Sequence, residues 1–203
     1  MFRSSRRDVV FPQMEHAVFA AGIALQWRER PNVPFDSFMR GIALHDRGYG
    51  ELDEDEIGAV EQPRWLEIQR RGFGGRGEDP VVDLVVSLHV ARLVGDDDPS
   101  LGERLPELLE RAGVGQAVAV AADRITNLCD RISFDVCLEQ PAEGSVGEIA
   151  YAYDGGNRVT VEPWPFAADR FAALLIGYRA EGYPHTLDRV VEPIAFARAN
   201  RRA

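Results

Sequence analysis

The segment Pro80–Val94, PVVDLVVSLHVARLV, constrains the fold more than any other part of this chain. Apolar residues would lie on nearly every face of a helix formed by it, and such a helix is stable only when other elements enclose it. The preceding Asp79 and the proline at position 80 are typical of a helix start. The sequence therefore predicts a central buried helix with further helices packed around it.

Four other stretches are expected to form helices. Residues 13–29 and 35–48 repeat apolar side chains every three or four positions, and the second ends at a glycine, a common helix terminator. A short helix is expected over 101–111. The longest helix is expected over 116–140, with an apolar stripe on one side.

The pattern changes beyond Pro141. EIAYAYDGGNRVTVEPW alternates apolar and polar residues around a DGGN turn, as a β-hairpin does, and RFAALLIGYRA predicts a third strand. We therefore expect a mainly α protein, with a helical bundle over residues 1–145 and a small antiparallel β appendage over 146–203. The appendage is expected to pack on the bundle rather than fold as an independent domain.

Composition narrows the possible functions. The formal net charge is −10 and all 23 basic residues are arginines. The negative charge argues against broad nucleic-acid binding, and the lack of lysine excludes a Walker-type phosphate lysine and a Schiff-base lysine. Neither a membrane-spanning apolar run nor a signal peptide is recognisable, so we expect a cytoplasmic protein without membrane contact. Cys129 and Cys137 lie about two helical turns apart and are expected to be buried free thiols.

Polar residues interrupt the apolar faces of all four main helices. They are His16, the dipeptide His45-Asp46, His89 and Asp130, each on or beside the stripe expected to face the core. One histidine on an apolar face is more often a hydrogen-bonded core residue than a ligand. Three imidazoles and two carboxylates together are costly to bury unless they pair or bind a metal. Their nitrogen and oxygen atoms suit Mn, Fe, Zn, Co or Ni, so we expect one or two divalent transition-metal ions.

The order His, His-Asp, Asp resembles the ligand pattern of the HD-domain superfamily of metal-dependent phosphohydrolases. By this resemblance, the bundle over residues 1–145 is expected to be an HD-domain-like helical bundle. This resemblance implies that His16, His45, Asp46 and Asp130 bind the first ion, and that His89 is the additional histidine of a second ion. The flanking sequences MEHAVFAAGIALQW, ALHDRGYGELD, DLVVSLHVARL and NLCDRISFDVCL look like an HD-like bacterial group, the domain-of-unknown-function 3891 family. The likeness covers roughly residues 10–165.

By resemblance, the expected reaction is hydrolysis of a phosphoester or phosphoanhydride by metal-activated water, with Asp46 as the catalytic carboxylate and a phosphorylated small molecule as substrate. The lysine that many members carry after the dipeptide is missing. Arg47 is the nearest phosphate-binding candidate, although its sequence context favours a surface position. Two alternatives stay open: a non-haem di-iron oxygenase, and a non-enzymatic metal-binding or interaction protein.

Two further polar residues share the helix face of Asp130. Asp123 and Asn127 lie seven and three residues before it, so they either orient metal ligands or bond between helices. His185, in GYPHTLD, is expected in a loop. Apolar faces on the hairpin suggest a possible homodimer.

Overall fold

The computed structural model describes residues 1–75, 77, 79–95 and 97–199. The helical elements, in chain order, are α1 (Gln13–Ala24), α2 (Phe35–Ala43), the 3-10 turn η1 (Arg47–Tyr49), α3 (Gln62–Gly72), α4 (Pro80–Val94), α5 (Pro99–Glu103), α6 (Leu105–Ala112) and α7 (Gln116–Leu138). The strands are β1 (Phe2–Arg3), β2 (Val9–Phe11), β3 (Ala142–Val146), β4 (Ile149–Tyr153), β5 (Arg158–Glu162), β6 (Arg170–Arg179) and β7 (Arg189–Arg198).

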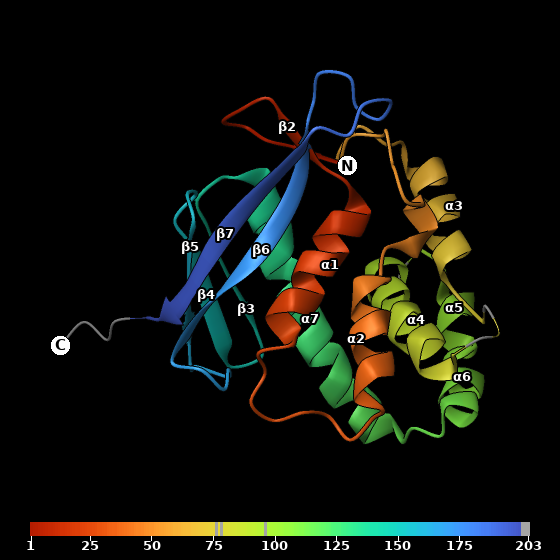
Figure 1. Ribbon diagram of the computed structural model, residues 1–203. Coiled ribbons are helices and arrows are strands. Elements are labelled where there is room, and N and C mark those ends of the chain that lie inside the picture. The colour runs from red at the N-terminus through yellow and green to blue at the C-terminus, as the bar shows by residue number, and fades with distance from the viewer. Residues whose placement is uncertain (76, 78, 96, 200–203) are drawn as a thin grey trace.

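All seven strands form one curled sheet in the order β1-β2-β6-β7-β5-β4-β3. Only the pairing of β5 with β7 is parallel. The sheet lies on one side of the molecule, with α1 and α7 next to it and α3, α5 and α6 on the far side (Figure 1).

The expectation of a mainly α protein with a small β appendage is wrong. Helices make up 44% of the chain, and the sheet is a seven-stranded half-barrel rather than a minor addition. The predicted hairpin exists as β4 and β5, and the predicted third strand is β6. Strands β1, β2, β3 and β7 were not predicted. β1 and β2 are too short to show a period-two pattern, and the pairing of β2 with β6, about 170 residues away, has no local signal. Residues 200–203 of the expected appendage lie outside the described residues.

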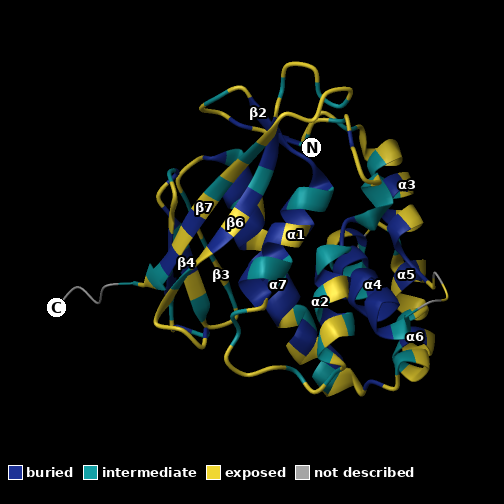
Figure 2. Cartoon of the chain, in the orientation of Figure 1, coloured by how far each residue is buried: buried dark blue, intermediate teal, exposed yellow. Residues whose placement is uncertain are grey.

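Two hydrophobic cores hold the helices in place. The larger joins the inner face of the sheet to α1 and α7 and includes Phe19, Ile132 and Phe166. The smaller encloses α4 between α6 and the start of α7, with Val86 and Leu108 as buried members. In Figure 2 α4 is buried along most of its length, whereas α7 has buried residues interrupted by exposed ones. Because α1, α4 and α7 are packed between or beside these cores, polar side chains on their facing surfaces have fixed positions.

The prediction of a buried helix at α4 is confirmed. Asp79 caps it by accepting hydrogen bonds from the backbone N–H groups of Val81 (3.0 Å) and Val82 (3.3 Å). Gly41 allows α2 to approach α4 closely, since a Cβ there would lie 2.6 Å from Val85 Cβ. Cys129 and Cys137 are buried and free, as expected. None of the helices in the described part of the chain has the length and apolar character needed to cross a membrane.

Candidate metal centre

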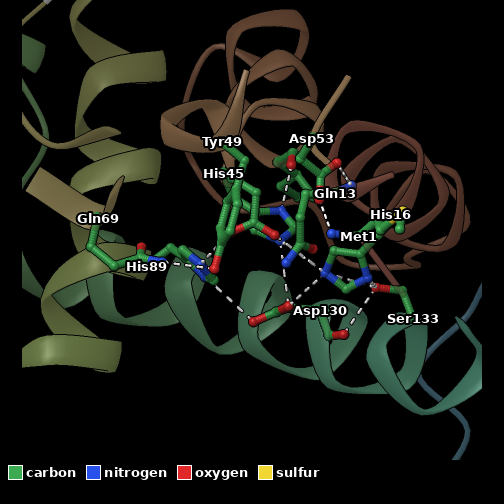
Figure 3. Close-up of polar contacts among 12 residues, drawn as sticks. Met1, Gln13, His16, His45, Tyr49, Asp53, Gln69, His89, Asp130 and Ser133 are labelled. Carbon is green, nitrogen blue, oxygen red and sulfur yellow. Dashed lines mark hydrogen bonds and ion pairs between the residues drawn. The ribbon is translucent and has the colours of Figure 1, made fainter. Parts of the chain in front are cut away.

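The structure brings together all five residues of the predicted metal centre (Figure 3). His16 lies on α1, His89 on α4 and Asp130 on α7. His45 and Asp46 follow α2, which ends at Ala43, so they occupy the turn before η1 rather than the last turn of a helix. All three imidazoles are at most 2% exposed, and the two carboxylates are 9% exposed.

The polar atoms of these side chains converge on a small volume. His16 Nε2 is 3.3 Å from His45 Nε2 and 3.1 Å from Asp130 Oδ1. Asp46 Oδ2 lies 3.4 Å from His45 Nε2 and 3.6 Å from His16 Nε2. His89 stands on the opposite side of Asp46, with its Nε2 3.4 Å from Asp46 Oδ1.

Hydrogen bonds at the outer nitrogens orient two of the rings. Ser133 Oγ donates its only proton to the Asp130 carbonyl (2.9 Å), so it accepts from His16 Nδ1 (2.7 Å). His45 Nδ1 donates to the carbonyl of Ile42 (2.7 Å). When each ring is neutral, its Nε2 therefore carries a lone pair, and the two lone pairs face each other. Such an arrangement is favourable only with a proton or a metal cation between the two atoms, and these outer bonds are the kind that orient metal-binding imidazoles.

His89 is held differently, by an arginine. Arg92 Nη2 is 3.0 Å from His89 Nδ1 and 3.2 Å from Asp130 Oδ2. A guanidinium only donates hydrogen bonds, so His89 Nδ1 accepts, and the proton of the neutral ring sits on Nε2. Arg92 is fixed in turn by a short contact from its Nη1 to Asp123. His89 Nε2 is buried and has no hydrogen-bond partner among the described residues, so its N–H is available to a bound molecule.

The charges in the centre are strongly coupled. Burial acts to lower the pKa of His45, but the carboxylates of Asp46 and Asp130 outweigh it and raise that pKa to about 10. Burial acts to raise the pKa of Asp46, yet the imidazoles of His45 and His89 hold it well below its usual range. The pKa of Asp130 is likewise lowered, mainly by His89 and His45, against the effect of burial. The centre therefore favours positive charge between two ionised carboxylates.

This donor set fits a divalent transition-metal ion. His16, His45 and Asp130 can present ligand atoms within 4.8 Å of one another, and so can His45, Asp46 and His89. Imidazole nitrogen and carboxylate oxygen are ligands of Zn, Mn, Fe, Co and Ni. The two overlapping sets share His45, so the geometry accommodates one ion or two closely spaced ions.

A cavity of about 770 Å³ opens from the centre. Its lining includes four members of the centre, His16, Asp46, His89 and Asp130, and the side chains of Gln13, Tyr49, Trp65, Phe134 and Tyr151. A volume of this size suits a small-molecule ligand. The ligand cluster therefore lies at the wall of a binding pocket rather than in a closed core.

The remaining sequence candidates have distinct positions. Asp123 reaches the centre only through Arg92, and Asn127 lines the cavity. Arg47 is neither a surface residue nor part of the described cavity lining. Its guanidinium is 11% exposed and donates to the carbonyls of Gly72 and Gly74, holding the connection after α3. His185 is exposed in a turn, as expected.

Sequence reasoning missed the residues that orient the centre. Arg92 and Ser133 each follow a candidate residue, His89 and Asp130, by three positions on the same helix. Residues three apart share a helix face, so this spacing could have identified both. Gln13 and Tyr49 offered no comparable signal, because their place in the cavity depends on the packing of α1 against the η1 turn.

Comparison with known proteins confirms the predicted similarity to the domain-of-unknown-function 3891 family. The model of a family described as "Protein of unknown function (DUF3891)" matches residues 2–179. The chain belongs to this family. This match does not show membership of the HD-domain superfamily, and that membership stays a hypothesis.

One protein that is similar to this chain has an assigned activity. The chain is similar to the 23S rRNA (uracil(1939)-C(5))-methyltransferase RlmD of Chromohalobacter salexigens, with 27% identity over 216 aligned positions. The alignment covers 89% of this chain and 46% of that enzyme, so the chain spans about half the length of this relative. No solved structure matches the chain.

Proposed function

We propose that this protein is a metal-dependent hydrolase of phosphoesters or phosphoanhydrides, with an HD-type order of ligands. One observation carries the proposal: the Nε2 atoms of His16 and His45 lie 3.3 Å apart, with Asp130 and Asp46 beside them, at the wall of a cavity. The seven-stranded sheet does not affect this proposal, because all five candidate residues lie on the helical side of the molecule.

His16, His45, Asp46 and Asp130 would hold the ion. Once bound, a divalent ion would activate water near neutral pH and polarise a phosphoryl oxygen. Asp46 Oδ2 faces the two histidines, whereas Oδ1 points toward His89 and can accept a proton from the attacking water. The sequence suggested His89 as a ligand of a second ion. The Arg92 contact instead favours a neutral His89 whose Nε2–H would donate a hydrogen bond to a phosphoryl oxygen of the substrate.

Metal content of the purified protein tests the proposal. We expect close to one ion per chain in the wild type, measured by elemental analysis after purification without chelators or a histidine tag. Asp46→Asn should lose most of the ion. Asp135→Asn is the matched control, because Asp135 lines the same cavity but lies outside the cluster, and it should retain the ion. Absence of metal from the wild type after reconstitution with Mn, Fe, Zn, Co and Ni would refute the proposal.

Metal content, measured together with phosphate release, distinguishes the two possible roles of His89. If His89 donates a hydrogen bond to the substrate, His89→Gln keeps the ion but loses phosphate release. Loss of a second ion from this variant would show that His89 is a metal ligand. Bound iron with oxygen-dependent turnover, and no phosphate release from phosphoesters, would favour the oxygenase alternative instead.

A further inference from the structure

The cavity beside the metal centre has aromatic walls. Tyr49 from η1, Trp65 from α3, Phe134 from α7 and Tyr151 from β4 all line it. Phe134 is 37% exposed and lines the cavity, so part of its ring can contact a bound molecule. Rings contributed by four separate elements favour a flat, apolar body in the bound molecule.

The cavity carries little spare positive charge. Arg92 and Arg131 are the cations of its described lining, and the carboxylates Asp55 and Asp135 line it as well. Arg92 is already engaged by Asp123 and by the centre. A divalent ion would balance the two ligand carboxylates, and Asp55 is paired with Arg64 outside the lining, so the described lining offers no surplus of positive charge beyond Arg131. A ligand with several anionic groups would therefore find too few cations to balance its charge.

A buried acceptor on the cavity wall lacks a partner. Gln13 is 2% exposed, and its Oε1 has no hydrogen-bond partner among the described residues. Its backbone N–H is fixed by Asp53 Oδ1 (2.9 Å), and its side-chain amide bonds to the hydroxyl of Tyr49. Leaving a buried carbonyl oxygen unpaired is costly, so a ligand that donates a hydrogen bond here would be favoured.

We infer that the substrate is a monoester with a single anionic group on an uncharged aromatic body that carries a hydrogen-bond donor for Gln13. The inference rests on the proposed function and narrows it. Polyphosphate chains are excluded as preferred substrates by the charge of the cavity, and purely aliphatic esters by its aromatic walls.

Three phosphonates test whether the cavity prefers an aromatic body and disfavours a second anionic group. Phenylphosphonate, propylphosphonate and 2-carboxyethylphosphonate have a carbon–phosphorus bond that this hydrolysis does not cleave, so calorimetry on the metal-loaded protein reads binding alone. Phenylphosphonate should bind at least about tenfold tighter than propylphosphonate, because the ring adds buried apolar area. The additional carboxylate should make 2-carboxyethylphosphonate bind more weakly than propylphosphonate. Equal binding of the phenyl and propyl compounds, or tighter binding of the carboxyethyl compound, would overturn the inference.

Positional isomers of hydroxyphenylphosphonate test Gln13. The best isomer should bind about three- to tenfold tighter than phenylphosphonate, as one neutral hydrogen bond allows. Gln13→Met should abolish that advantage while phenylphosphonate still binds, which also shows that the variant is folded. Gln62→Met, the same change at the exposed start of α3, should keep the tighter binding of that isomer. If no isomer gains in the wild type, or if the gain survives in Gln13→Met, Gln13 does not recognise the ligand.

Failure of this inference is distinguishable from failure of the proposed function. Phosphate release from phenyl phosphate reports hydrolysis, and the phosphonate series reports ligand preference. Hydrolysis without the expected preference would overturn the inference alone. The expected preference without any hydrolysis would overturn the hydrolase proposal and uphold the ligand class.

Discussion

Binding of a divalent ion to the metal-free protein is predicted to release about one proton per ion at about pH 7.5. The proton comes from His45, whose Nε2 would become a metal ligand. Burial lowers the pKa of this residue, but Asp46 and Asp130 raise it to about 10. Proton and metal ion therefore compete for the same nitrogen.

The size of the effect follows from that pKa. At about pH 7.5, less than about one per cent of His45 would be neutral, so nearly every binding event must displace the proton. Because raising the pH removes the competitor, metal affinity should increase about tenfold per pH unit from about pH 7 and level off near pH 10.

Calorimetry in buffers of different ionisation enthalpy measures the released protons directly. The slope of observed enthalpy against buffer enthalpy gives their number per ion. Asp135→Asn should give the same slope as the wild type, because Asp135 lies outside the cluster. Stoichiometric binding with no proton release, or an affinity independent of pH, would refute the reasoning about His45.

Three further outcomes are expected. Gly41→Ala should destabilise the protein by about 1–3 kcal/mol in urea unfolding and weaken metal binding, because the new Cβ would press against Val85 and displace the helix that precedes the His-Asp turn. Gly22→Ala, inside α1 with no atom within 4 Å of the new Cβ, should stabilise by about 0.5–1 kcal/mol, and destabilisation there would contradict the packing described. In the metal-free protein, the lowered pKa values of Asp46 and Asp130 contribute stability that is present above about pH 4 and is lost as the pH falls. Urea midpoints between about pH 6 and pH 3 should therefore drop less in the Asp→Asn variants than in the wild type.

Local sequence patterns predicted most of the helical part correctly. The periodicity of α1, α4 and α7 depends on residues three or four positions apart in the sequence. It can therefore be recognised without knowing which elements each helix packs against. The same local faces placed His16, His89 and Asp130 toward the interior. Convergence of these residues could be predicted because buried polar groups on packed helices have few places to meet.

The sheet and the chemistry of the centre depended on tertiary structure. Val9–Phe11 is three residues long, and it is a strand because β6 supplies its hydrogen-bond partners from the other end of the chain. The proton position on His16 follows the same logic, since Ser133 on α7 decides which nitrogen of this α1 residue faces the centre. Composition and periodicity determined which side chains enter the interior. Contacts between residues distant in sequence decided how the strands pair and what each buried polar atom can bind, because hydrogen bonds depend on partners that no local pattern contains.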